Sequence, residues 1–319
     1  MLILIFKLFI YMGYVVNIYK QNFLQRFDID EAVPFYSPKD FKGLVFEENS
    51  FENSSGVNIK YFYFYYPKYQ KDKIVLFCPG IGPGHVSYLA EIEWLCKSGY
   101  KVLTLDYAGC GYSGGERLPS TNGPTKDIVE LLDKLQLKEE IVVVGHSLGG
   151  YTAYNVINLK PEIHKAVIIS GYVDIASEMQ TFMKFRFLAN KVKRFEKKLD
   201  PVYGNIDNWK YLKNTADEIL IIHSPDDQMV GYKYSTQKVA KLGNPHIHIH
   251  IVDNRKHNPN YSDEALAFMN NSMYGYNKLL AENKDITLEE RKQYFLDKPI
   301  EKLTAQDPAI IKLVCDFIK

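Results

Sequence analysis

Short apolar runs alternate with amphipathic segments through the middle of the chain. Runs such as KIVLF, IVVV and ILII are continuously apolar, which is typical of strands buried on both faces. The segments between them, such as EIEWLCKSGY and TKDIVELLDKL, carry apolar residues at helical spacing. This alternation predicts βαβ units in an α/β fold, with a mostly parallel central sheet flanked by helices.

The first part of the predicted domain follows a different pattern. Residues 21–56 are mixed and polar, without clear periodicity. The segment IKYFYFYYP, residues 59–67, is rich in aromatic residues and strand-like. We expect it to add an antiparallel edge strand at the start of the sheet.

Two later segments interrupt the strand–helix rhythm. Residues 172–215 contain amphipathic stretches and no strand pattern, so we expect a helical cap over the carboxyl edge of the sheet. Residues 262–319 also predict helices, with a capping box at Thr287 and Glu290. We therefore expect one domain over residues 21–319, with the cap and a C-terminal helical extension as parts of it.

The N-terminal segment, residues 1–20, is the most apolar part of the chain. Its first sixteen residues are apolar apart from Lys7 and a glycine, a run shorter than the roughly 20 residues that a spanning helix needs. It lacks the basic start and small-residue cleavage site of a secretory signal. Three interpretations stay open: a membrane-surface or anchoring helix, a helix packed on the body, or an unusual signal. We expect a cytoplasmic or membrane-associated protein rather than a secreted one.

Composition narrows the class of protein. The chain has 319 residues, of which 46% are hydrophobic, enough to bury a sizeable core. The net charge of +1 provides no field for binding nucleic acid. Four scattered cysteines predict free thiols rather than a disulfide framework or a metal site. Nothing in the composition predicts an oligomeric state.

The segment IVVVGHSLGG places a serine between two glycines where a predicted strand meets a predicted helix. Gly145, Ser147 and Gly149 form the pattern G-x-S-x-G, in which a tight turn exposes the serine hydroxyl above a helix N-terminus. A serine nucleophile needs a base, and the base needs an orienting acid. Two aspartates, Asp226 and Asp227, follow a later strand, and His257 follows the last one. The order serine, acid, histidine is the one that this kind of turn requires.

The sequence resembles the α/β-hydrolase superfamily, nearest to its serine aminopeptidase and monoacylglycerol-lipase-like (lysophospholipase-like) group. The matching motifs, which include VLFCPGIGPG, VVVGHSLGG and IIHSPDDQMV, span residues 74–259. The resemblance implies a catalytic triad of Ser147, Asp227 and His257. Asp227 is favoured over Asp226 because the family pattern H-G-x-x-D-x-x-V aligns through its His and Val, although Ser224 stands where Gly is usual. The resemblance also implies an oxyanion hole.

The oxyanion hole would be made of two backbone N–H groups. One donor would belong to Leu148, the residue after the nucleophile, and the other to Ile81 in the loop PGIGPG. Pro79 stands where many members of the family have His. Lys256 precedes His257, where the family tends to have Gly.

These residues predict a serine hydrolase that cleaves small carboxylic esters, including lipid esters, through an acyl-enzyme and without a cofactor. Met and Phe residues in the cap and the apolar N-terminus favour a lipid-like substrate, and the N-terminus offers a contact with a membrane surface. One alternative is an aminopeptidase or amidase that uses the same triad, with Glu178 as the anchor for a substrate amine. Another is a hydrolase-fold binding protein without turnover.

The other histidines have simpler interpretations. His146 is expected to point away from the turn, and His85 lies in the oxyanion loop, where it would line the pocket. His246, His248 and His250 alternate along one predicted strand. We expect an ordinary strand face there rather than a metal site, because the sequence places no carboxylate or cysteine cluster beside them.

Overall fold

The fold is built on one large sheet. The computed structural model describes residues 2–70, 72–183 and 185–319, with side chains from residue 13 onward, and within them the sheet has eight strands in the order β1-β2-β4-β3-β5-β6-β7-β8. The strands from β3 to β8 run parallel, and β1 and β2 are antiparallel. The predicted α/β fold with a mostly parallel sheet is confirmed. The strands are β1 Val45–Glu52, β2 Asn58–Tyr65, β3 Lys73–Cys78, β4 Lys101–Leu105, β5 Glu140–His146, β6 Lys165–Ile169, β7 Glu218–His223 and β8 Ile247–Ile251.

The edge of the sheet differs from the prediction. The aromatic segment becomes β2, which pairs with β4 on one side and with β1 on the other. The strand β1 lies in a stretch where no strand was predicted, and it forms the edge. Its side chains alternate between half-buried and exposed, and its polar residues Glu47, Asn49 and Ser50 suit an edge strand. The prediction failed because such polar residues hide the apolar alternation.

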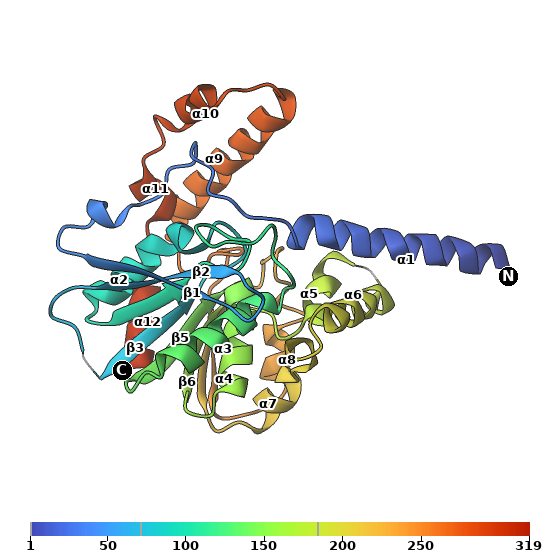
Figure 1. Cartoon of the computed structure of the whole chain (residues 1–319), viewed down its shortest axis with the longest axis horizontal. Coiled ribbons are helices and arrows are strands. Elements are labelled where there is room, and N and C mark those ends of the chain that lie inside the picture. Colours follow the sequence, from blue (N-terminus) through green and yellow to red (C-terminus); the bar gives the residue numbers. More distant parts are fainter. Residues whose placement is uncertain (1, 71, 184) are drawn as a thin grey trace.

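Helices cover both faces of the sheet (Figure 1). On β3, Ile74 and Leu76 face one core with helices α3 and α4, while Val75 and Phe77 face a second core with α2 and α12. This alternation is the two-residue period of a strand buried on both faces. The helices are α1 Leu2–Phe23, α2 Leu89–Lys97, α3 Gly123–Leu135, α4 Leu148–Leu159, α5 Ile175–Phe182, α6 Arg186–Leu199, α7 Asn208–Asn214, α8 Thr236–Ala240, α9 Asp263–Glu282, α10 Leu288–Phe295, α11 Ile300–Thr304 and α12 Pro308–Ile318, with the 3-10 helices η1 Pro38–Asp40, η2 Gly84–Tyr88 and η3 Tyr203–Asn205.

The segment after β6 is helical, as expected of residues 172–215. It holds α5, α6, η3 and α7 before the chain re-enters the sheet at β7. Helix α5 begins with a capping box between Asp174 and Ser177, and Lys193 of α6 pairs with the same aspartate. These contacts hold α5 and α6 together.

The N-terminal helix α1 extends away from the body, but its C-terminal half packs on α6 (Figure 1). Val15 and Tyr19 are buried, and the Tyr19 hydroxyl donates to Glu196 Oε1 at 2.8 Å. The ring of Phe23 stacks on that of Tyr19. Residues 13–23 therefore follow the interpretation of a helix packed on the body. In the part of the chain that the structure describes, no helix is long and apolar enough to cross a membrane.

The C-terminal helices divide into two groups. Helices α9, α10 and α11 form an arm that stands off the sheet, with its own small core of Ala32, Tyr276 and Phe295 (Figure 1). Helix α12 returns to the sheet and packs in the core beside α2. The arm is thus inserted between the loop that carries His257 and the last helix of the main fold.

Candidate active site

Ser147 lies in a strained turn between β5 and α4. Its backbone has φ 56° and ψ −120°, a conformation that residues other than glycine rarely adopt. Its N–H donates to the carbonyl of Ile169 at 2.9 Å. The flanking glycines make the turn sterically feasible. A Cβ on Gly145 would lie 2.1 Å from the carbonyl oxygen of Gly149, and one on Gly149 would lie 1.9 Å from that of Cys78.

His257 and Asp227 are hydrogen-bonded to each other. The distance between His257 Nδ1 and Asp227 Oδ2 is 2.8 Å. A carboxylate only accepts, so Nδ1 carries the proton and Nε2 is left as an acceptor when the ring is neutral. This is the tautomer that a general base next to a serine needs.

Asp227 is buried and held from several sides. The N–H groups of Met229 and Val230 donate to its Oδ1, at 2.8 and 3.0 Å, and His223 Nε2 lies 3.1 Å from its Oδ2. Burial by itself would raise the pKa of Asp227, but the hydrogen bonds from His223 and His257 outweigh it and hold the pKa well below its usual value. The carboxylate therefore stays charged. Asp226 is exposed and contacts Ser224 and the Lys256 N–H instead.

His146 does not point away from the site, contrary to the expectation from its place in the turn. Its ring lies 4.8 Å from that of His257, and its Nε2 donates to the His257 carbonyl at 2.9 Å. Its Nδ1 accepts from the Tyr88 hydroxyl, also at 2.9 Å. Burial, followed by repulsion from His257, lowers the pKa of His146 to about 3. The neutral ring of His146 thus holds the backbone of His257 in place through a hydrogen bond.

The loop that carries Ile81 runs beside the serine. A Cβ on Gly80 would lie 3.3 Å from Ser147 Cβ and 3.2 Å from the carbonyl oxygen of His146, so the loop packs tightly against the turn of Ser147. Leu148 is the first residue of α4, where backbone N–H groups have no partner within the helix. The loop that carries Ile81 and the N-terminus of α4 therefore both lie at Ser147.

No direct hydrogen bond joins the serine to the histidine. Among the described side chains, Ser147 Oγ makes no hydrogen bond with His257, although His146, its neighbour, contacts both the ring and the backbone of His257. Catalytic hydrogen bonds in unliganded sites are often long and tighten when substrate binds.

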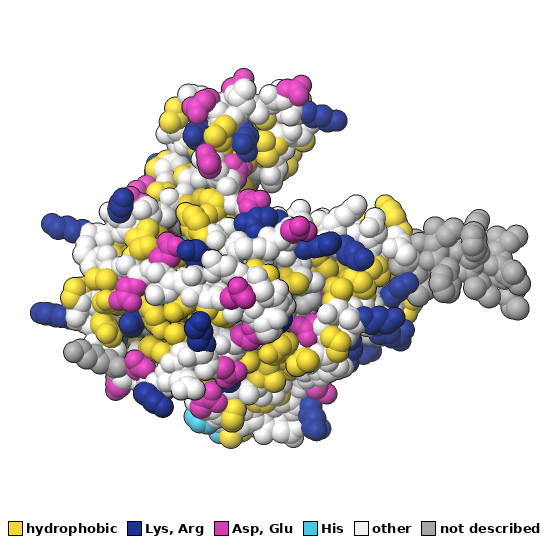
Figure 2. Space-filling view, in the orientation of Figure 1, with side chains coloured by type: hydrophobic (Ala, Val, Ile, Leu, Met, Phe, Trp, Pro, Cys, Tyr) yellow, Lys and Arg dark blue, Asp and Glu magenta, His cyan; other side chains and the backbone are white. Residues whose placement is uncertain are grey.

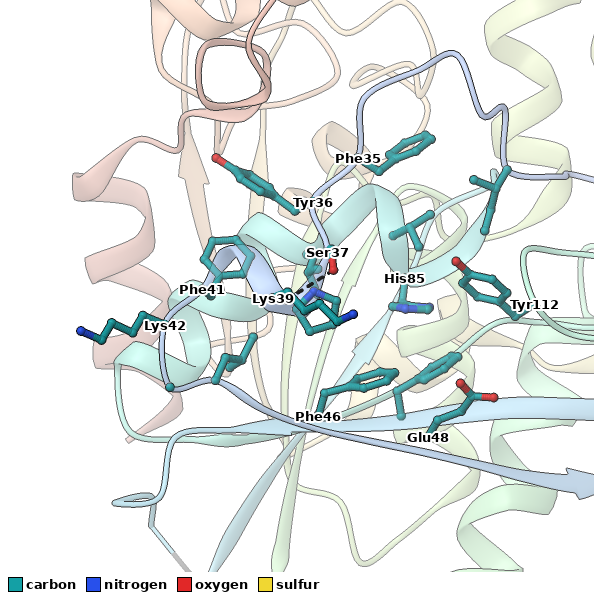
Figure 3. A pocket seen from close by; sticks show the side chains of 17 residues that line it. Phe35, Tyr36, Ser37, Lys39, Phe41, Lys42, Phe46, Glu48, His85 and Tyr112 are labelled. Atoms are coloured by element: carbon teal, nitrogen blue, oxygen red, sulfur yellow. Dashed lines mark hydrogen bonds between the residues drawn. The ribbon is translucent and has the colours of Figure 1, made fainter. Parts of the chain in front are cut away.

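His85 lies away from the serine. Its Nδ1 is 2.9 Å from Asp106 Oδ1, and its ring lies against Phe62 with the centroids 3.9 Å apart. It lines a cavity of about 790 Å³ between the chain around Phe41 and the strand β2, with Tyr112 beside it (Figure 3). Neither Ser147 nor His257 lines this cavity.

Two of the alternating histidines, His246 just before β8 and His248 within it, have a carboxylate partner that the sequence did not predict. Glu218 of β7 accepts from His246 Nδ1 and His248 Nε2, both at 2.7 Å, and these hydrogen bonds lower the pKa of Glu218. His250 is exposed on the same strand. Within the described residues, no group of three or more His, Cys, Asp or Glu is arranged to hold a metal ion.

Glu178 of α5 is a buried carboxyl group near the candidate triad. Its Oε2 has no hydrogen-bond partner among the described residues. Burial, followed by the negative charge of Asp227, raises the pKa of Glu178 well above its usual value.

Comparison with known proteins identifies the family. The sequence model of the serine aminopeptidase S33 family matches residues 69–218, which contain the loop of Ile81 and the turn of Ser147. The chain belongs to the α/β-hydrolase superfamily. The predicted resemblance is thereby confirmed, although the matched range ends before Asp227 and His257.

Several curated proteins match shorter stretches of this α/β hydrolase. Human mitochondrial palmitoyl-protein thioesterase ABHD10 is 34% identical over 119 residues, which are 35% of this chain and 37% of the relative. The sn-1-specific diacylglycerol lipase ABHD11 of Xenopus laevis is 29% identical over 103 residues, 32% of this chain and 33% of the relative. The chain thus spans little more than a third of the length of these relatives.

Solved structures share the fold over most of the chain. An esterase of Pyrococcus furiosus superposes with a TM-score of 0.57 at 20% identity, covering 81% of this chain and 98% of its own. Est1E of Butyrivibrio proteoclasticus, solved with ferulic acid bound, has a TM-score of 0.53 at 17% identity and covers 77% of this chain and 98% of its own. At such identities the likeness concerns the fold.

Proposed function

We propose that this α/β hydrolase is a serine hydrolase of carboxylic esters, with Ser147 as nucleophile, His257 as base and Asp227 as the acid that orients it. The observation that carries the proposal is the strained backbone of Ser147 beside a histidine whose Nδ1 is held by a buried, charged aspartate. Strain of this kind is found where it serves a mechanism.

The reaction would proceed in two steps. His257 Nε2 removes the proton of Ser147 Oγ, which attacks the ester carbonyl, while the N–H groups of Ile81 and Leu148 stabilise the oxyanion. His257 then gives its proton to the leaving alcohol, and an acyl-enzyme remains. Water, deprotonated by His257, attacks this ester and releases the acid. Asp227 keeps the imidazole in its tautomer and stabilises its charged form.

The relatives support esters or thioesters with apolar acyl groups as substrates. Their names describe a palmitoyl-protein thioesterase and a diacylglycerol lipase, both of which act on fatty acyl groups. A serine nucleophile attacks both kinds of acyl carbonyl by the same steps. We therefore propose an acyl ester or thioester as the substrate class.

The test is hydrolysis of p-nitrophenyl esters from acetate to palmitate, together with labelling by a fluorophosphonate probe. We expect turnover and labelling by the wild type, and loss of both in Ser147→Ala. A Leu159→Ala variant, altered at the exposed C-terminal end of α4, serves as the control and should behave as the wild type. Labelling of Ser147→Ala at the wild-type rate would exclude Ser147 as the nucleophile, and a wild type inert to both reagents would exclude the hydrolase.

A second candidate function is an aminopeptidase or amidase, and Glu178 is the observation that favours it. A substrate ammonium group could pair with this buried carboxyl group, whose Oε2 has no partner among the described residues. Burial argues the other way, because it raises the pKa of Glu178 and so disfavours the charged form that would attract a cation. Turnover of aminoacyl p-nitroanilides that is lost in Glu178→Gln would favour the peptidase, whereas ester turnover retained in that variant would favour the esterase.

We also propose that α1 and α6 contact an anionic membrane surface. Apart from Lys7, the sequence of residues 2–12 is apolar, Ile18 of α1 and Phe182 of α5 are partly exposed, and Lys and Arg side chains gather beside the N-terminal helix (Figure 2). Each basic residue near such a surface contributes about 1 kcal/mol. We expect sedimentation with phosphatidylserine vesicles but not with phosphatidylcholine vesicles. Replacement of Lys191, Arg194 and Lys198 by Glu should weaken it more than tenfold, and unchanged sedimentation would contradict the proposal.

A further inference from the structure

A second cavity lies beside the candidate active site, at the base of the arm. It has a volume of about 740 Å³ and is enclosed by residues 25–36, the segment of η2 and α2, and helices α9 and α11; we call it the arm cleft. This volume is in the range of cavities that hold small molecules. The arm stands off the body above it, as the space-filling view shows (Figure 2).

The lining of the arm cleft is apolar along one face of α9. Met269, Met273, Tyr276 and Leu280 all line it, and their spacing of four, three and four residues places them on one stripe of the helix. From the first to the last of them the helix rises about 16 Å, at 1.5 Å per residue. The cleft is therefore elongated along α9, and two of its wall residues are methionines, which adapt to irregular apolar ligands.

The charged groups of the arm cleft are neutralised at its wall. Asp30 accepts from the Tyr276 hydroxyl at 2.7 Å and pairs with Arg291 of α10 at 3.0 Å. Asp28 pairs with Arg26. The cleft thus presents no unpaired acid that would attract a cation, and these contacts tie the arm to the N-terminal segment.

One end of the arm cleft lies near the loops of the proposed catalytic groups, although neither Ser147 nor His257 lines it. Asn258, which lines it, follows His257 in the chain, and Pro83 lies on the loop that carries Ile81. Tyr88 forms part of the wall, and its hydroxyl donates to His146 next to the nucleophile. A chain that lies in the cleft would therefore have its head beside Tyr88, which contacts the residue before the nucleophile.

The cap provides a poorer site for an apolar chain. Its aromatic residues Phe182 and Phe187 are 48% and 49% exposed, so they do not line an enclosed pocket. The cavity around His85 carries Lys39, Lys42 and Glu48, and neither His257 nor Asn258 borders it (Figure 3). The arm cleft alone among these three combines an apolar lining with a wall residue, Asn258, that follows His257 in the chain.

We propose that the arm cleft binds the unbranched acyl chain of the substrate, so that the arm, rather than the cap, selects chain length. This inference rests on the proposed hydrolase function for its catalytic consequence. Binding of the chain itself does not depend on turnover, and the two can be tested separately.

The experiment introduces tryptophan at three positions of α9 in the full chain. Met269 lies at the N-terminal end of the stripe, toward the loop of His257, and Leu280 lies at its C-terminal end. We expect Met269→Trp to lower the ratio of kcat/KM for p-nitrophenyl decanoate to that for the acetate at least tenfold. Leu280→Trp should lower the ratio of kcat/KM for the palmitate to that for the acetate, and leave the same ratio for the butyrate unchanged. Tyr274→Trp, on the exposed face of the same helix, is the matched control and should keep every ratio.

Binding of cis-parinaric acid, measured by its fluorescence in Ser147→Ala protein, separates this inference from the hydrolase proposal. We expect Met269→Trp to raise its Kd at least tenfold and Tyr274→Trp to leave it unchanged, with thermal unfolding used to confirm that each variant folds. Binding that depends on the cleft, together with a wild type that hydrolyses none of the esters, would support the cleft and overturn the hydrolase proposal. If the wild type and all variants hydrolyse esters with the same dependence on chain length, the cleft proposal is overturned. If Met269→Trp does not fold, the test is the ratio of kcat/KM for the palmitate to that for the acetate in Leu280→Trp.

Discussion

At the scale of single residues, the candidate site depends on how each side chain is held rather than on which residues are present. Asp226 and Asp227 are neighbours with the same chemistry, yet one is exposed and the other is buried against two histidines. His146 and His257 are also alike in kind, but burial lowers the pKa of His146 and keeps its ring neutral, whereas the ring of His257 contacts Asp227 and is the proposed base. The environment assigns the roles.

The two aspartates provide a matched pair for mutation. We expect Asp227→Asn to lower kcat on p-nitrophenyl butyrate by about 10³–10⁴, because an amide no longer enforces the tautomer with a proton on Nδ1. Asp226→Asn should change kcat less than threefold, since Asp226 does not contact His257. The measurement is steady-state kinetics of both variants, and a larger loss in Asp226→Asn would assign the orienting role to that residue.

Glu91 predicts a pH dependence of stability. It is buried, accepts a hydrogen bond from Asn260 at 3.1 Å, and burial raises its pKa from 4.5 to about 7. Below pH 4.5 it is protonated in both the folded and the unfolded state. Between pH 4.5 and 7 only the unfolded state loses the proton, so rising pH lowers the free energy of unfolding, by about 3 kcal/mol in total.

Glu91→Gln removes this contribution. We expect urea unfolding between pH 5 and 7 to show a weaker fall of stability in Glu91→Gln than in the wild type. Part of the fall will remain, because burial also raises the pKa of Asp127 to about 6. An unchanged slope in the variant would show that Glu91 does not titrate in this range.

At the scale of elements, α1 and the arm are the parts that set this chain apart from a plain sheet with flanking helices. Each is tied to the body by a few buried polar contacts. For α1 the contact is Tyr19 with Glu196, and for the arm it is Asp30 with Tyr276 and Arg291. Removal of such a contact should loosen the element while the sheet stays folded.

Tyr19→Phe tests the attachment of α1. The change deletes a buried hydrogen bond to a carboxyl group, so we expect the free energy of unfolding to fall by about 1–3 kcal/mol. Tyr14→Phe on the exposed side of the same helix should have no measurable effect. Differential scanning calorimetry of both variants is the measurement, and equal Tm values would show that α1 is not coupled to global unfolding.

At the scale of the whole molecule, the two large cores lie on the faces of the sheet, and the arm has a separate, small one. The residues Ala32, Tyr276 and Phe295 of that core are apart from both sheet cores. Local unfolding is easiest where few apolar contacts are buried. The arm should therefore open more readily than the sheet, which would also admit a ligand to the arm cleft.

Hydrogen exchange measures this difference. We expect amides of α9 and α10 to exchange at least a hundredfold faster than those of β5 and β6, because the strands open only with the whole fold. Addition of a non-hydrolysable alkyl phosphonate to the wild type should slow exchange in α9. Arm amides as protected as those of β5 would show that the arm is part of the main cooperative unit.

The sequence by itself determined the α/β class, the parallel sheet and the membership of the superfamily. These features are local: buried strands are continuous apolar runs, and the G-x-S-x-G turn is read within five residues. It also supplied the candidate residues Ser147, Asp227 and His257 in the chain order serine, acid, histidine. The strand β1 was missed because an edge strand need bury only one face, so its polar residues break the pattern.

Only the tertiary structure decided which groups meet. His146 contacts the backbone of His257, and Glu218 contacts His246 from the neighbouring strand segment. Glu178 Oε2 is left without a hydrogen-bond partner among the described residues. Each of these outcomes depends on residues from different strands, loops and helices. The arm cleft likewise needs the N-terminal segment and α9 side by side. Periodicity along a chain reports which face of an element is buried, but it carries no information on what that face is buried against.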